Sequence, residues 1–109
     1  AERWLVVRGW HVLARRYRVG HRDIDLIVRR DQVVAFVEVK ARYSPQFGGP
    51  MCAVGRAKRR HLWRAAMIWI DRYGAADLEY RFDVVGVLAS GGLIRIAHLE
   101  NAFTVEHAR

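Results

Sequence analysis

The sequence predicts an α/β fold in which a mixed sheet of about five strands is flanked by helices. The chain has 109 residues and is 52% hydrophobic, which is enough to bury a core in one domain spanning residues 1–109. Several short segments alternate in polarity, and one longer segment has apolar residues at helical spacing. The predicted order is a helix, three strands, a second helix and two strands.

The first part of the chain predicts the end of one helix and three strands. Residues 1–8 resemble the last turns of a helix that Gly9 ends, and the absence of an initial methionine indicates that this helix begins upstream of the given chain. Residues 11–19 predict a strand of the edge type. Residues 23–28 alternate apolar and polar side chains, and residues 33–40 send alternate side chains to opposite faces.

The second part predicts a loop, a helix and a hairpin. Residues 44–55 carry both prolines and three of the nine glycines, which is typical of a loop. Residues 57–73 carry an apolar stripe at helical spacing, and Gly74 ends this helix. Residues 80–88 and 93–98 predict two strands that pair across a turn rich in glycine.

The charge balance favours a nucleic-acid partner. Lysine and arginine total 19 against 11 acidic residues, which gives a net charge of +8. The single cysteine, Cys52, excludes an intramolecular disulfide and a cysteine-rich zinc site, so we expect a cytoplasmic protein. No uncharged apolar run is long enough for a transmembrane helix.

Three charged residues form the most informative pattern. Glu38 and Lys40 lie two positions apart on a predicted strand and therefore share a face. Asp25 lies on the preceding strand. If Ile24 and Leu26 share the face of the apolar residues on the second strand, Asp25 falls near Glu38.

Two neighbouring carboxylates require a positive charge to offset their repulsion, which is roughly 4 kcal/mol at about 4 Å in a dielectric near 20. Mg²⁺ suits this role because it prefers oxygen ligands and binds through one or two carboxylates. A metal held by Asp25 and Glu38 would orient a water for attack on a phosphodiester, with Lys40 beside that water. The alternative is structural, with Lys40 and Arg42 only neutralising the two acids.

Further residues have both a functional and a structural interpretation. The basic start of the second helix would contact phosphates, or it would be an ordinary solvated helix face. Asp83 would be structural, paired with Arg81 or Arg95, or would belong to the site. The basic residues of this helix are Lys58, Arg59, Arg60 and Arg64.

Two segments are similar to the YraN-like family. Residues 22–27, Arg-Asp-Ile-Asp-Leu-Ile, resemble the Gly-Glu-Ile-Asp-Leu-Ile segment of that family. Residues 35–42, Ala-Phe-Val-Glu-Val-Lys-Ala-Arg, resemble its most characteristic stretch. Similarity along the rest of the chain is found at Gly48, Lys58, residues 81–85 and residues 101–103.

The resemblance implies a restriction-endonuclease-like core, akin to that of Holliday-junction resolvases. It also implies the PD-(D/E)xK arrangement, with Asp25, Glu38 and Lys40 in the motif positions. Two departures stand out. Arg22-Asp23 replaces the family's Gly-Glu, and the family's Gly-Glu before the first helix falls upstream of Ala1.

The sequence therefore predicts a metal-dependent DNA endonuclease that acts on duplex or branched DNA with Mg²⁺ or Mn²⁺. Asp25, Glu38 and Lys40 are the predicted catalytic residues, Asp25 and Glu38 the metal ligands and Asp23 an accessory acid. We expect a homodimer, because such a substrate offers two scissile strands. The alternatives are a nucleic-acid-binding module with a vestigial site and a protein-interaction domain. The predicted nucleic-acid-binding residues are Arg42, Lys58, Arg59, Arg60 and Arg64.

Overall fold

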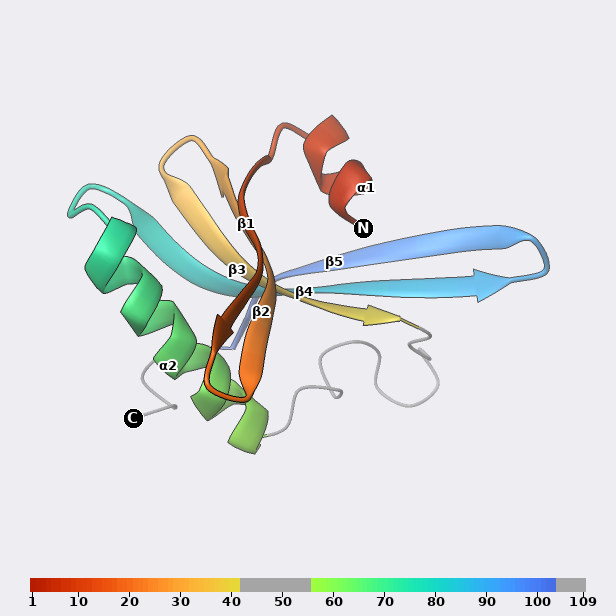
Figure 1. The fold of residues 1–109 in the computed structure, drawn as a ribbon. Coiled ribbons are helices and arrows are strands. Elements are labelled where there is room, and N and C mark those ends of the chain that lie inside the picture. The colour runs from red at the N-terminus through yellow and green to blue at the C-terminus, as the bar shows by residue number, and fades with distance from the viewer. Residues whose placement is uncertain (42–55, 104–109) are drawn as a thin grey trace.

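The computed structural model describes residues 1–41 and 56–103 (Figure 1). Helices and strands follow one another within these residues in the predicted order. The predicted loop at 44–55 lies outside the described residues. The elements are α1 (Glu2–Val7), β1 (His11–Val19), β2 (Arg22–Arg30), β3 (Val33–Ala41), α2 (Arg56–Tyr73), β4 (Glu79–Ser90) and β5 (Leu93–Phe103).

The five strands form one mixed sheet in the order β1-β2-β3-β4-β5. Neighbouring strands are antiparallel except β3 and β4, which are parallel. A parallel pair needs a crossover connection, and α2 lies in the connection between these two strands. The prediction of a mixed five-stranded sheet flanked by helices is confirmed, and the arrangement is consistent with a restriction-endonuclease-like core.

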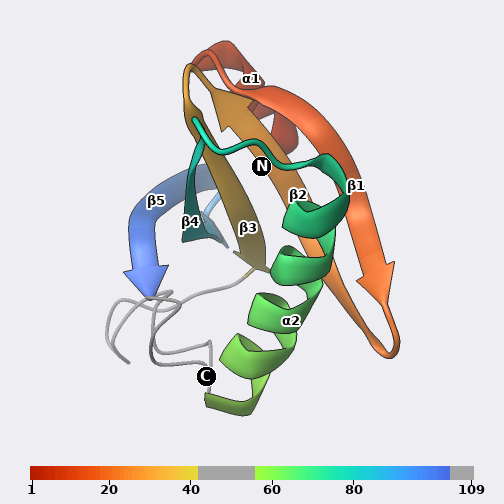
Figure 2. The ribbon, with the colours of Figure 1, turned by 90° about the vertical axis from the view of Figure 1, so that its left-hand side faces the viewer.

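Helix α2 covers one face of the sheet (Figure 2). Its apolar stripe, which includes Leu62, Ala66 and Trp69, packs on Phe36 and other side chains of β2, β3 and β4. We call this cluster the α2-side core. The buried members of the cluster are Ile24, Ile27, Val34, Phe36, Leu62, Ala65, Ala66, Trp69, Phe82, Val84, Ala102 and Phe103.

Within the described residues, neither helix is long and apolar enough to cross a membrane.

A second cluster, the α1-side core, lies on the opposite face of the sheet. Leu5 of α1 and Trp10 are almost completely buried there against the strands. Strand β3 is therefore covered on both faces, which explains its nearly continuous apolar sequence. The buried members of this cluster are Leu5, Trp10, Leu26, Val28, Ala35, Val37 and Val85.

Strands β4 and β5 form a long hairpin that extends away from the rest of the sheet (Figure 1). Its turn consists of Gly91 and Gly92, whose positive φ angles of 55° and 79° are those of a type I′ turn. The strand predicted to end at His98 continues to Phe103. A register irregularity and a positive φ of 52° at Asn101 allow the strand to bend and remain paired.

Candidate active site

The two candidate carboxylates lie on neighbouring antiparallel strands. The paired residues of β2 and β3 extend to Leu26 and Val37, and Asp25 and Glu38 follow directly beyond this pair. Asp25 Oδ2 accepts a 2.8 Å hydrogen bond from the backbone N–H of Val39. The register that was predicted from the alternation of apolar residues on these two strands is therefore confirmed.

Strand β2 changes the direction of its side chains at Asp25. Leu26 packs in the α1-side core, whereas Ile24 packs in the α2-side core. The prediction that Ile24 and Leu26 share a face is therefore wrong, because regular alternation does not hold at this point. Strand β1, which pairs with β2, is irregular across from Asp25, since Arg16 has a φ of 47°. Asp25 remains half-buried, and its carboxylate reaches across to β3.

Glu38 is buried and forms an ion pair with the first turn of α2. The residue is only 6% exposed, and its Oε1 lies 2.5 Å from Lys58 Nζ. Burial raises the pKa of Glu38, the Lys58 ammonium lowers it and the Asp25 carboxylate raises it further, so that the pKa ends above its ordinary value. Glu38 is thus a buried acid whose pKa depends on burial and on charged side chains of β2 and α2.

Replacing Glu38 with glutamine is expected to raise the free energy of unfolding at neutral pH. Because the pKa of Glu38 is raised above 4.5 in the folded chain, the folded state binds more protons than the unfolded state between the two pKa values. Stability therefore falls as pH rises through that window. The uncharged Glu38→Gln variant avoids this loss. Its free energy of unfolding in urea should therefore exceed that of wild type by more at neutral pH than below pH 4.5. The exposed Glu79→Gln change is the control, and a variant less stable than wild type at neutral pH would contradict the prediction.

Lys40 is close enough to contribute to the same electrostatic field. It is half-buried two residues beyond Glu38 on β3, where alternate side chains share a face. Its positive charge lowers the pKa of Glu38, and the Asp25 charge raises it. The three residues of the predicted pattern therefore lie in one electrostatic neighbourhood at the end of the β2–β3 ladder.

The chemistry of the pair fits a hard divalent cation. Asp25 Oδ1 and Glu38 Oε2 receive no hydrogen bond from the described residues, so each acid keeps an oxygen for another ligand. No group of three or more histidine, cysteine or acidic side chains suited to a metal occurs within 1–41 and 56–103. Mg²⁺ requires only one or two carboxylates when waters complete its coordination. The predicted accessory acid, Asp23, is exposed and stands opposite Arg18 on β1.

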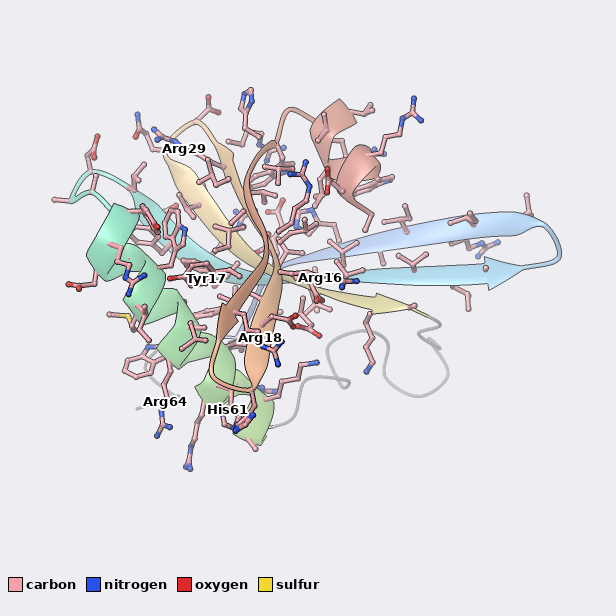
Figure 3. The ribbon with its side chains drawn as sticks, viewed as in Figure 1. Arg16, Tyr17, Arg18, Arg29, His61 and Arg64 are labelled. Atoms are coloured by element: carbon pink, nitrogen blue, oxygen red, sulfur yellow. The ribbon has the colours of Figure 1, made fainter. Side chains whose placement is uncertain are left out.

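The predicted nucleic-acid-binding residues fall into separate environments. Lys58 is bound to Glu38, and Arg59 is half-buried with its guanidinium over an aromatic ring of β5. Arg60 and Arg64 are exposed on α2, and Figure 3 shows Arg64 directed outward from the helix. Arg42 lies outside the described residues. The ion pair between Lys58 and Glu38 could not be predicted from the sequence, because only the packing of α2 on the sheet brings these two residues together.

A second buried carboxylate lies on the α1 side of the sheet. Asp83 is fully buried, and Arg81 Nε–H donates a 3.0 Å hydrogen bond to its Oδ1. Its Oδ2 lies 2.7 Å from His98 Nε2, and the backbone N–H of Asn101 donates a 2.9 Å bond to Oδ1. Burial alone would raise the pKa of Asp83, but the bonds from His98, Asn101 and Arg81 outweigh burial and lower the pKa. The structural interpretation with Arg81 as partner is confirmed, whereas Arg95 is exposed on β5.

Residues 1–87 match the model of the family described as "Uncharacterised protein family UPF0102". The chain belongs to the UPF0102 family. This confirms the resemblance to the YraN-like family at the level of the family. The matched residues of the UPF0102 chain include Asp25, Glu38, Lys40, Lys58 and Asp83.

The UPF0102 chain is similar to proteins from several bacteria that bear the same family name. It is 42% identical to a UPF0102 protein of Chloroherpeton thalassium over 80 residues, which cover 73% of this chain and 62% of the relative. It is 39% identical to one of Anaeromyxobacter dehalogenans over 103 residues, covering 94% and 77%. It is 40% identical to one of an Anaeromyxobacter species over 106 residues, covering 97% and 80%. The chain thus spans less than two thirds of the first of these relatives.

Proposed function

We propose that this UPF0102 chain is a metal-dependent endonuclease that hydrolyses phosphodiester bonds in duplex or branched DNA. The observation that carries the proposal is the Asp25 and Glu38 pair, in which each acid keeps an oxygen free of hydrogen bonds from the described residues. The pair adjoins Lys40 on a chain of net charge +8. The sequence resemblance to the PD-(D/E)xK superfamily adds support.

Each residue of the proposed site has a distinct role. Asp25 and Glu38 would hold Mg²⁺ or Mn²⁺, and the bound ion would act as a Lewis acid toward the attacking water and the negatively charged phosphate. Lys40 donates a hydrogen bond to the attacking water or to a phosphate oxygen. Lys58 neutralises Glu38 while no cation is bound. A cation held by Glu38 would take over this role, and Lys58 would then be free to contact the DNA backbone.

The buried position of Glu38 supports this assignment over a purely structural ion pair. Burial of an acid is unfavourable, and an exposed acid would form an ion pair with Lys58 at lower cost. Placing that acid beside a second carboxylate adds repulsion, which the raised pKa of Glu38 reflects. Sites that oppose folding in this way are typical of functional residues.

The 109-residue chain is expected to cleave DNA only when a divalent ion is present. Duplex, flapped, branched and single-stranded substrates are incubated with Mg²⁺, with Mn²⁺ and with excess chelator, and the products are separated by size. Metal-dependent cleavage supports the proposal. Binding to DNA without cleavage under any of these conditions supports the alternative, a nucleic-acid-binding module with a vestigial site.

If roughly six to eight phosphates are contacted, the logarithm of the DNA affinity should fall with the logarithm of the salt concentration at a slope of about −5 to −7. A protein-interaction domain would show no such affinity for DNA.

A further inference from the structure

Arg16 has a backbone conformation that is unusual for its residue type. Within the described residues, positive φ angles at residues other than glycine occur at Arg16, Asp31 and Asn101, with values of 47°, 55° and 52°. Asp and Asn tolerate this region because of their short polar side chains, but a long side chain such as arginine does not favour it. Arg16 also lies in the middle of β1, where no turn requires a positive φ.

The unusual φ of Arg16 coincides with a change of face along β1. Arg15 is directed toward α1, where its Nε lies 2.7 Å from Glu2 Oε1, whereas Tyr17 packs against the α2-side core. These two neighbours would share a face in a regular strand. Arg16 therefore absorbs the change of direction on β1, as Asp25 does on β2.

The strand register places Arg16 beside the candidate active site. Arg15 pairs with Leu26 and Tyr17 pairs with Ile24, so the residue between them lies across from Asp25. Facing residues of antiparallel strands have Cα atoms about 4.5–5.5 Å apart. The backbone of Arg16 therefore lies one strand away from that of Asp25, whose carboxylate is directed to the backbone N–H of Val39 on β3.

The guanidinium of Arg16 is available for another anion. The side chain is exposed, and it has no hydrogen bond or ion pair with any described residue, Asp25 included. Figure 3 shows Arg16 and Arg18 on β1, with His61 near the start of α2. Arg18 is also exposed, so two cations flank the β1 side of the site while Lys40 and Lys58 lie on its β3 and α2 side.

We propose that Arg16 binds a backbone phosphate of the DNA strand that enters the site past Asp25. The inference rests on the proposed function and adds to it, because it assigns β1 a part in substrate binding that the basic helix alone would not supply. A planar guanidinium suits the paired oxygens of a phosphate. The strained backbone is then retained for the position it gives this group, as strain at functional sites commonly is.

Three variants of the 109-residue chain test the role of Arg16. Arg16→Gln removes the guanidinium, and Arg16→Gly removes it while also relieving the positive φ, which glycine adopts without strain. Arg3→Gln is the matched control, because it removes the same charge from an exposed position on α1. Affinity for a fluorescent duplex is measured in chelator as a function of salt, cleavage is measured with Mg²⁺ or Mn²⁺, and stability is measured by thermal unfolding.

We expect both Arg16 variants to weaken DNA binding about 5- to 10-fold at 0.1 M salt and to reduce the magnitude of the salt slope by about 1. Arg3→Gln should remain within about twofold of wild type, since its contribution is only long-range charge. Arg16→Gly should melt no lower than wild type. A residue with only a structural role would show the opposite pattern, with reduced stability and unchanged binding.

The possible outcomes separate this inference from the proposed function. If Arg16→Gln binds and cleaves DNA as Arg3→Gln does, the inference is wrong even when wild type is an active nuclease. If wild type binds DNA but never cleaves it, the endonuclease proposal fails, and the salt slope of the Arg16 variants still decides the phosphate contact. If wild type has no affinity for DNA, both proposals are overturned.

Discussion

DNA cleavage is expected to fall at least about 100-fold when Glu38 is replaced with alanine, and to fall strongly when Lys40 is replaced with alanine. Loss of residues that only orient metal ligands typically costs 10- to 100-fold, so loss of a ligand should cost at least the upper value. Glu38 is one of two acids in the site, and within the described residues no third acid is placed to substitute for it. Initial rates on one DNA substrate at saturating Mg²⁺ measure the effect.

DNA binding supplies the control for this prediction. Glu38→Ala should bind DNA in chelator at least as tightly as wild type, because the change removes a negative charge near the phosphates and frees Lys58. Glu79→Ala makes the same charge change at an exposed position at the start of β4 and should cleave normally. A Glu38→Ala variant that retains more than about a tenth of wild-type cleavage would rule out this residue as a metal ligand.

Replacing Asp83 with alanine is expected to lower the free energy of unfolding by about 3–5 kcal/mol. The change leaves Arg81 and His98 without the carboxylate that holds them, and Arg81 is mostly buried. It also removes the acceptor for the backbone N–H of Asn101 at the bend of β5. Denaturant unfolding monitored by tryptophan fluorescence measures the loss.

The pH dependence of the Asp83 effect has a defined sign. The pKa of Asp83 is lowered in the folded chain, so its stabilisation is present above the ordinary value of 3.8 and is lost as pH falls through the folded value. The difference between wild type and Asp83→Ala should therefore shrink in acid. Asp83→Asn, which keeps one acceptor, should be destabilised less, and the exposed Asp77→Ala should be nearly neutral. Equal stability of Asp83→Ala and wild type at neutral pH would contradict the prediction.

The arrangement of Asp25, Glu38 and Lys40 was accessible from sequence because it depends on local rules. Apolar alternation on two strands joined by a short turn restricts their register, since a shift by one residue would exchange the buried and exposed faces. The same rule failed for Ile24, whose face depends on the irregular backbone around Arg16 on the neighbouring strand. An arginine gives no local signal of a positive φ, so the change of face could not be predicted.

Contacts between distant segments were less accessible. The ion pair of Glu38 with Lys58 joins residues that are separated by 20 positions, and it depends on how α2 packs on the sheet. The bonds from His98 and Asn101 to Asp83 depend on the extended pairing of β4 with β5. The predicted strand ended at His98, whereas β5 continues to Phe103, because the polar residues Glu100 and Asn101 interrupt the apolar pattern at the bend.

The hydrogen bond from Val39 to Asp25 makes the two acids of the site unequal as targets for mutation. The Asp25 carboxylate takes the place of a main-chain carbonyl. It accepts a hydrogen bond from the backbone N–H of Val39, which lies beyond the last described backbone pair of β2 and β3. Alanine at this position would leave that amide unbonded and disturb the alignment of Glu38 and Lys40, so lost turnover would have two causes. Asparagine keeps an oxygen that can accept this hydrogen bond. Asp25→Asn therefore separates the effect of the negative charge from the effect of the hydrogen bond that joins the two strands.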